Sequence, residues 1–362
     1  MENAGHEAAL RRGSFRDISI DILRGLAIVL MILANLTPAL LMPPAPGWYR
    51  FLSSLAAPLF IVTAGTMVAL SRTGRGRSFT YIAIRGGLVI LAGALLELLV
   101  FRYIPFIDMD VLYLIGISLP LAYLYLGLPE RKRLLIPAAI LLMAPVLWAG
   151  IGYSTTVIEP VFSLFSPSVP GTPVPGLADI VKSWFVDGWF PVFPWTALAL
   201  FGAEAGMYRW GRGEVRSFRF STEGLRAAGL LAGGGVLWAL FPGAQAVREG
   251  YVELFYPPVT GLLLFSAGFF LLALTVLDHL PGYYSLMDPL KAAGECSLAI
   301  YLIHYTIIQL VIAPLTIRLP VLPYLGLYLV LLAGMILVAY LLRHVRKSWK
   351  DQPFVVRFLI GG

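Results

Sequence analysis

Charge is scarce in this sequence. Only 13% of its 362 residues are Asp, Glu, Lys or Arg, against roughly 25% in soluble domains. In contrast, 59% of the residues are hydrophobic and the mean hydropathy is +0.82. Apolar runs long enough to cross ~30 Å of hydrocarbon recur along the whole chain. These features exclude an ordinary soluble domain and predict an all-α integral membrane protein with many spans.

Other absences narrow the function further. The single cysteine, Cys296, excludes an internal disulfide. The sequence contains no recognisable set of metal ligands, no P-loop and no dinucleotide-binding fingerprint, so we expect no metal. Few carboxylates lie near the middle of the apolar runs, which argues modestly against proton-driven transport. The N-terminal stretch MENAGHEAALRRG is polar and lacks the layout of a cleaved signal peptide.

The net charge of +7 does not indicate nucleic-acid binding. Most Lys and Arg residues gather in short segments on alternate sides of the apolar runs, as the positive-inside rule requires. No basic domain is large enough to grip a duplex, so we expect no nucleic-acid partner. The pattern predicts a multi-pass protein of the cell (plasma) membrane, surrounded by lipid, with both termini in the cytosol.

The apolar runs predict a polytopic bundle of about ten transmembrane helices, ten or eleven in all. We expect cytosolic tails at residues 1–17 and 346–362, and a single transmembrane domain at 18–345 with an outer loop at 153–189. The ten expected spans cover approximately residues 18–42, 50–70, 79–100, 109–128, 134–152, 190–209, 225–243, 256–277, 294–315 and 323–343.

Three polar residues follow one face of the first expected span. Asp21, Arg24 and Asn35 coincide with a repeat of three and four residues, so they share a helical face that must look into the bundle. With 1.5 Å per residue, Asn35 lies about 16 Å beyond Arg24. Asp21 and Arg24 either anchor the helix end as an ion pair or meet a charged ligand. Asn35 is a candidate for chemistry, and an amide bonded between helices is the alternative.

A second polar face lies in the ninth expected span. Ser297, Tyr301, His304 and Tyr305 are spaced at i, i+4, i+7 and i+8, and His304 is the histidine of this sequence that falls inside a span. It lies about 15 Å along the helix, at a depth similar to that of Asn35. A histidine at that depth can act as a general base. The alternative is a neutral histidine satisfied by a carbonyl or a Tyr hydroxyl.

Short charged segments flank the spans. SRTGRGRS, residues 71–78, places Arg72, Arg75 and Arg77 in an expected cytosolic loop. Guanidinium forks and free N–H groups in such a loop can hold phosphates, although the positive-inside rule alone accounts for arginines there. At the other end of the third span, Glu97 is followed by Asp108 and Asp110. These carboxylates either shape an acceptor site or form interfacial ion pairs.

The motifs in series resemble a known family. DILRGLA (21–27), followed by Asn35, is similar to the first helix of the heparan-alpha-glucosaminide N-acetyltransferase-like family of transmembrane acyltransferases. Three further segments resemble that family in its order: APLFIVTAGTMVALS (57–71), FPVFPWTALALFGAEAG (190–206) and GECSLAIYLIHYTII (294–308). The resemblance implies a ten- or eleven-span helical fold that is often dimeric. It also implies acetyl-CoA as the cytosolic co-substrate and an amino or hydroxyl sugar as the acceptor on the far side.

The resemblance also suggests roles for residues. Asn35 matches the asparagine of the family's active site, and His304 matches the histidine of the late Ser-Leu-x-x-Tyr-x-x-His segment. Arg72, Arg75 and Arg77 match the cytosolic loop by position only. The sequence departs from the animal enzyme in one respect, because its first outer loop (LTPALLMPPAPGWYRFL) contains no histidine. We therefore expect either that His304 provides the base or that Asn35 and proximity suffice.

These observations lead to one main hypothesis. The protein is expected to be an acyltransferase that moves an acetyl or other short acyl group from cytosolic acyl-CoA to an extracytoplasmic sugar or glycolipid. Arg24, Arg72, Arg75 and Arg77 would hold the CoA, and Asn35 and His304 would be catalytic. Asp21, Ser297 and Tyr301 would support them, and a homodimer would agree with the family. The alternatives are a non-catalytic lipid or glycolipid transporter and a structural membrane scaffold.

Overall fold

The computed structural model describes residues 16–154, 175–211, 215–240, 252–349 and 351–361. Within these ranges the chain is helical, and the pairing of extended backbone is limited to a single bridge between Leu41 and Leu319. Seven helices in the described part are long and apolar enough to cross a membrane. The predicted all-α membrane fold is therefore confirmed.

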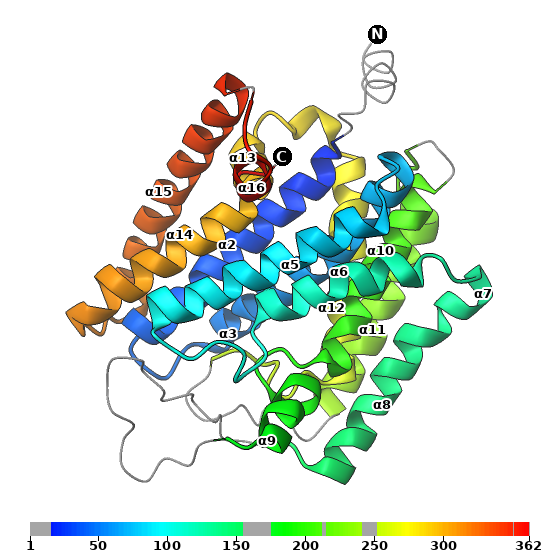
Figure 1. Cartoon of the computed structure of the whole chain (residues 1–362), viewed down its shortest axis with the longest axis horizontal. Coiled ribbons are helices and arrows are strands. Elements are labelled where there is room, and N and C mark those ends of the chain that lie inside the picture. The colour runs from blue at the N-terminus through cyan, green and yellow to red at the C-terminus, as the bar shows by residue number, and fades with distance from the viewer. Residues whose placement is uncertain (1–15, 155–174, 212–214, 241–251, 350, 362) are drawn as a thin grey trace.

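The helices pack side by side as a bundle, with α15 and α8 on two outer sides (Figure 1). Several helices continue into a π-helical turn, namely α4 into η1, α5 into η2 and α14 into η7. The bounds are α2 (Ile18–Leu40), α3 (Gly47–Ser53), α4 (Ala56–Ala69), η1 (Leu70–Gly74), α5 (Phe79–Leu96), η2 (Glu97–Phe101), α6 (Val111–Tyr125), α7 (Glu130–Arg133), α8 (Leu135–Ile151), α9 (Leu177–Lys182), η3 (Ser183–Asp187), α10 (Val192–Trp210), η4 (Phe220–Gly224), α11 (Leu225–Leu240), α12 (Thr260–Asp278), η6 (Pro281–Tyr283), α13 (Asp288–Glu295), α14 (Ser297–Ile307), η7 (Ile308–Ile312), η8 (Ala313–Leu315), α15 (Val321–Ser348) and α16 (Phe354–Leu359).

Each of the ten predicted spans contains a helix in the structure. Three of them fall outside the seven long apolar helices. Helices α6 and α11 have only 15 and 16 described residues, fewer than the roughly 20 that cross a bilayer, and α10 carries Glu204 and Arg209. The total number of spans and their orientation stay predictions.

Helix α2 is the centre of the bundle. In its most apolar stretch, 72% of the residues are buried, whereas in the corresponding stretch of the helix that contains α8 the share is 6%. It begins where the side chain of Asp17 accepts hydrogen bonds from the backbone N–H groups of Ser19 and Ile20, which satisfies two donors that a helix start leaves unpaired. The polar face predicted for this helix therefore lies inside the bundle.

Small residues allow the central helices to approach closely, as is usual in membranes. A Cβ on Gly25 of α2 would lie 1.9 Å from the carbonyl oxygen of Leu290 in α13. A Cβ on Gly65 of α4 would lie 1.8 Å from the carbonyl oxygen of Ala199 in α10. Both distances are well below van der Waals contact, so a larger residue at either position would separate the helices that build the site.

Buried charges join the helices at the end of the bundle where α2 begins. The Arg209 guanidinium donates to Asp17 at 2.5 Å and to Asp278 at 2.5 Å, linking α10 to α2 and α12. Along α10, Glu204 pairs with Arg133 at 3.0 Å. Because each buried charge has a partner of opposite sign, its desolvation is compensated.

One predicted span is not continuous. The segment 294–315 was expected as a single helix, but α13 ends at Glu295 and α14 begins at Ser297. Cys296 between them has φ −109° and ψ 25°, outside the helical region, and its N–H bonds to the carbonyl of Ala293. This break places Glu295 and Ser297 at the end of the cavity described next.

Candidate active site

A cavity of about 1140 Å³ lies within the bundle. Its lining follows α5 and η2 from Tyr81 to Phe101, a rise of about 30 Å along a helix, which is comparable to the thickness of the hydrocarbon core. Helix α2 contributes Arg24 and Asn35, and α14 contributes Tyr301. Single small-molecule sites usually have 300–1,000 Å³, so this cavity is slightly above the upper end of that range.

One end of the cavity, called the basic end below, is lined by six arginines: Arg16, Arg24, Arg75, Arg77, Arg85 and Arg357. Two carboxylates lie among them. Asp21 accepts from Arg16 at 3.0 Å and pairs with Arg24 at 3.4 Å, and Glu295 lies 3.9 Å from Arg16. Positive charge therefore exceeds negative charge at this end.

The excess of positive charge affects Arg75. Burial, followed by the repulsion of Arg16 and Arg85, lowers the pKa of the Arg75 guanidinium, which nevertheless stays charged. A bound anion would relieve this repulsion, so the basic end fits a phosphate-bearing ligand.

The structure supports part of the predicted arginine set. Arg24, Arg75 and Arg77 line the cavity, but Arg72 is absent from its lining. Instead, Arg72 donates to the backbone carbonyl of Tyr123 at 2.6 Å and lies over the Tyr123 ring at 4.8 Å. This side chain ties its loop to the end of α6, and its assignment to the donor site stays a prediction.

Sequence reasoning missed Arg16, Arg85 and Arg357. Arg85 was detectable, because it lies inside an apolar helix and ionisable residues at such positions usually mark a site. Arg16 and Arg357 gave no such signal, since they lie near the two ends of the chain and only the fold brings them together (Figure 1).

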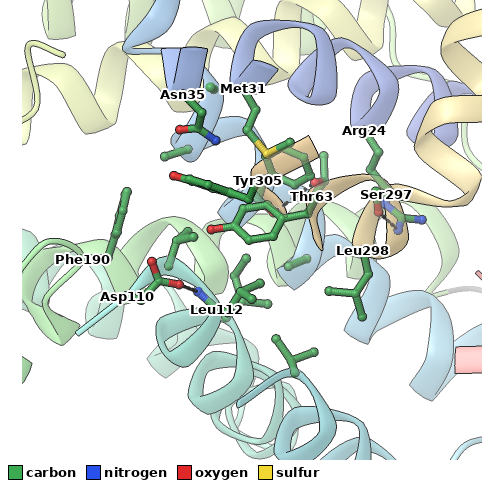
Figure 2. Close-up of a pocket in the computed structure, with 18 of the residues that line it drawn as sticks. Arg24, Met31, Asn35, Thr63, Asp110, Leu112, Phe190, Ser297, Leu298 and Tyr305 are labelled. Carbon is green, nitrogen blue, oxygen red and sulfur yellow. Dashed lines mark hydrogen bonds between the residues drawn. The ribbon is translucent and has the colours of Figure 1, made fainter. Parts of the chain in front are cut away.

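Asn35 and His304 meet in the middle of the bundle. The Asn35 side-chain nitrogen Nδ2 lies 3.0 Å from His304 Nε2, and His304 Nδ1 lies 2.9 Å from the backbone carbonyl of Ile300. The expected similar depth of the two residues is confirmed. Asn35 faces the cavity opposite Tyr305 (Figure 2). His304 is fully buried and is not among the residues that line the cavity.

These contacts define the tautomer of His304. A carbonyl oxygen only accepts hydrogen bonds, so Nδ1 carries the proton and Nε2 holds the lone pair. That lone pair accepts one N–H of the Asn35 amide. The second N–H and the oxygen of Asn35 are left for other partners. In this arrangement His304 fixes the orientation of Asn35, and its basic nitrogen does not face the cavity directly.

The supporting residues lie between Asn35 and the basic end. Arg24 donates a hydrogen bond to the Ser297 hydroxyl, which links α2 to the start of α14. Tyr301 lines the cavity, and the centroid of its ring lies 5.7 Å from that of the His304 ring in an edge-to-face contact. Figure 2 shows Arg24 and Ser297 at one end of the view, with Tyr305 between them and Phe190. The structure thus brings together every residue of the predicted site except Arg72.

The opposite end of the cavity, called the acidic end below, is lined by Glu97, Asp108, Asp110 and Glu253, together with the aromatic residues Trp189, Phe190 and Tyr256. Asp110 accepts from the backbone N–H of Leu112 at 2.9 Å and so caps α6. Asp108 accepts from the Ser183 hydroxyl, and Glu97 accepts from the Tyr113 hydroxyl. These donors hold the carboxylates in place.

Glu253 was not predicted, because it lies in a polar connector between two apolar runs. Burial raises the pKa of its carboxyl to about 7, and the nearby Arg50 only partly offsets this effect. Its ionisation state therefore changes within the physiological range. Among the described residues, no group of three or more His, Cys, Asp or Glu side chains is arranged to hold a metal ion.

The fold and the cavity define a polytopic membrane protein with one cavity that has a basic end and an acidic end. The family model described as "Heparan-alpha-glucosaminide N-acetyltransferase, catalytic" matches residues 16–241. The chain belongs to this family of transmembrane acyltransferases. The matched region includes Asn35 and the loop arginines, and it ends before His304 and the C-terminal residues. A comparison with curated proteins gives no significant match.

Proposed function

We propose that the protein transfers an acetyl or other short acyl group from cytosolic acyl-CoA to an extracytoplasmic sugar or glycolipid acceptor. The observation that carries this proposal is the single cavity with arginines at one end, carboxylates and aromatic rings at the other, and Asn35 between them. Membership of the acyltransferase family supports it independently. The positive-inside rule favours a cytosolic location for the basic end.

The donor would bind with its phosphates at the basic end. Arg75 and Arg77 lie on the loop between η1 and α5, and Arg24 lies further along the cavity. Guanidinium groups bind phosphate oxygens through paired, charge-assisted hydrogen bonds. The narrow pantetheine arm would then extend along the cavity toward Asn35 and carry the thioester to the middle of the bundle.

The acceptor would bind at the acidic end. Aromatic rings and fixed carboxylates suit a sugar, because they offer apolar faces together with acceptors for its hydroxyl or amino hydrogens. Trp189 and Tyr256 are in contact there, with ring centroids 5.9 Å apart. The reacting group of the acceptor would approach Asn35 from the side opposite to the donor.

The reaction is a direct transfer. The lone pair of the acceptor nitrogen or oxygen attacks the thioester carbonyl carbon, the bond between carbon and sulfur breaks, and the acceptor's proton passes to the departing thiolate. The products are the acylated acceptor and free CoA. The second N–H of Asn35 polarises the carbonyl oxygen, which is an oxyanion-hole role.

His304 then acts through Asn35. Its Nε2 holds the amide in one orientation, so that the second N–H is aimed before substrate arrives. A direct role as base for the acceptor, the other role open to His304, requires Asn35 to turn away first. The positioning role also agrees with the lack of a histidine in the first outer loop, because the departing thiolate can take the proton.

Calorimetry of the purified protein with CoA tests the donor site. We expect CoA to bind the wild type, and Arg75→Gln to weaken that binding about tenfold or more, the loss expected for one charge-assisted contact. Arg72→Gln is the matched control, since it removes the same charge from the same loop but from outside the cavity. Binding of a lipid-linked sugar without any affinity for CoA would refute the proposal and favour a glycolipid transporter.

A further inference from the structure

The two ends of the described chain meet at the basic end of the cavity. The C-terminal segment, residues 351–361, contains α16, which is labelled in Figure 1, and the carbonyl of Ile360 just after this helix accepts a hydrogen bond from the Cys296 thiol. The Gly361 carbonyl accepts hydrogen bonds from Arg16 at 3.0 Å and from Arg346 at 3.2 Å. The segment therefore has a defined position, because two arginines from different parts of the chain hold it.

Gly361 also has a residue-specific fit. Its φ of +85° is a conformation that side chains other than glycine rarely adopt. A Cβ at this position would lie 1.6 Å from the carbonyl oxygen of Glu295. The end of the chain thus packs directly onto the break between α13 and α14, where Ser297 and Arg24 enter the cavity.

The C-terminal segment forms part of the cavity wall. Phe354, Arg357 and Phe358 are among the lining residues. The Arg85 guanidinium carbon lies 5.2 Å from the centroid of the buried Phe358 ring. The exposed ring of Phe354 contacts the Tyr81 ring, with centroids 6.1 Å apart. These contacts place aromatic rings from two distant parts of the sequence on one surface, with guanidinium groups stacked against them.

This surface carries positive charge on two exposed arginines, Arg77 and Arg357. The ion pairs found among the described residues include none for Arg77 or Arg357, and both side chains are exposed. Arg77 lies over the Tyr81 ring at 4.7 Å. Two guanidinium groups beside an edge-to-face pair of aromatic rings match a nucleotide, because phosphates pair with arginine and bases stack on aromatic and guanidinium planes.

We propose that the C-terminal segment builds the nucleotide-binding part of the donor site, with Arg357 contacting a phosphate and the surface of Phe354 and Tyr81 receiving the base. This inference rests on the proposed function, because it assigns a place to the nucleotide half of acyl-CoA. It concerns residues beyond the region that the family model matches.

Two donors test the inference in the full-length protein. Acetyl-CoA carries the nucleotide, and S-acetylpantetheine carries the same thioester without it. For Arg357→Gln we expect kcat/KM with acetyl-CoA to fall about tenfold or more, mainly through KM. The value with S-acetylpantetheine should not change. Lys347→Gln is the charge-matched control, since Lys347 is exposed on α15 and absent from the cavity lining.

Other outcomes overturn the inference. An equal fall with both donors would mean that Arg357 only supports the structure. No fall with either donor would mean that the nucleotide binds elsewhere. A gain of activity in Arg357→Gln would mean that the segment closes the cavity instead of binding the donor.

A binding measurement separates this inference from the proposed function. Adenosine 3′,5′-bisphosphate contains the nucleotide of CoA but no thioester. If the wild type binds it and Arg357→Gln binds it about tenfold more weakly, the C-terminal site stands even without acyl transfer. If transfer occurs but Arg357→Gln binds the bisphosphate as the wild type does, this inference is wrong and the proposed function stands.

Discussion

The hydrogen bond between Asn35 and His304 leads to a prediction about how their effects combine. Asn35 faces the cavity, whereas His304 is buried behind it and holds its amide through Nε2. If His304 acts only by orienting Asn35, its removal matters only while Asn35 is present. A double-mutant cycle measures this dependence. It compares Asn35→Ala, His304→Ala and the variant that carries both substitutions.

The expected magnitudes follow from the contacts. Asn35→Ala removes the donor that faces the carbonyl, and loss of one oxyanion-hole donor lowers kcat about 10²- to 10³-fold. His304→Ala leaves one buried amide hydrogen unpaired, which costs about 1–3 kcal/mol, or roughly tenfold to a hundredfold in kcat. The kcat of the double variant should equal that of Asn35→Ala to within about threefold.

The assay is release of free thiol from acetyl-CoA in the presence of acceptor, with each variant purified in detergent. Donor affinity serves as the control for folding, because the basic end contains neither residue. His304→Gln should recover part of the rate lost in His304→Ala, since its side-chain oxygen can accept the Asn35 N–H. Multiplicative losses in the double variant would refute the reasoning and show that His304 acts on the substrates independently.

Three further predictions concern folding and pH. Gly65→Ala should lower the thermal midpoint in detergent, at a cost of about 1–3 kcal/mol, because the new Cβ would lie 1.8 Å from a carbonyl oxygen of α10. Gly87→Ala is the control and should leave the midpoint unchanged, because nothing lies within 4 Å of its Cβ. Arg209→Gln should destabilise the fold by about 3–5 kcal/mol, because it leaves the buried carboxylates of Asp17 and Asp278 without their cation; an unchanged midpoint would contradict this. Burial raises the pKa of Glu253 from 4.5 to about 7, so the folded state keeps a proton that the unfolded state releases. The contribution of Glu253 to stability should therefore be complete below about pH 4.5 and be lost as pH rises to about 7, and Glu253→Gln should remove this part of the pH dependence of the thermal midpoint.

The arrangement along single helices was predictable from the sequence. The positions of Asp21, Arg24 and Asn35 on one face depend only on helical periodicity. The similar depth of Asn35 and His304 followed from counting residues along two spans that cross the same thickness of membrane, whereas their hydrogen bond did not. Periodicity and depth therefore identified the middle of the cavity.

The ends of the cavity were less predictable, because they depend on contacts between distant segments. Arg72 lies in the predicted loop, but the π-helical turn η1 directs its side chain to the carbonyl of Tyr123. Arg357 lies in the short helix α16 and Glu253 in a connector, neither of which carries a periodic signal, and packing alone brings both to the cavity. Arg85 was the exception, since an arginine inside an apolar helix can be recognised from sequence alone.

The measurement that tests the central claim most directly is transfer of labelled acetyl in sealed vesicles that contain the oriented protein. Acetyl-CoA is supplied on one side of the membrane and glucosamine on the other. We expect labelled acetylglucosamine only when the donor is on the side of the basic end, and loss of that product in Asn35→Ala. Bound acetyl-CoA that never gives its acetyl group to an amino or hydroxyl sugar, from either side, would contradict it.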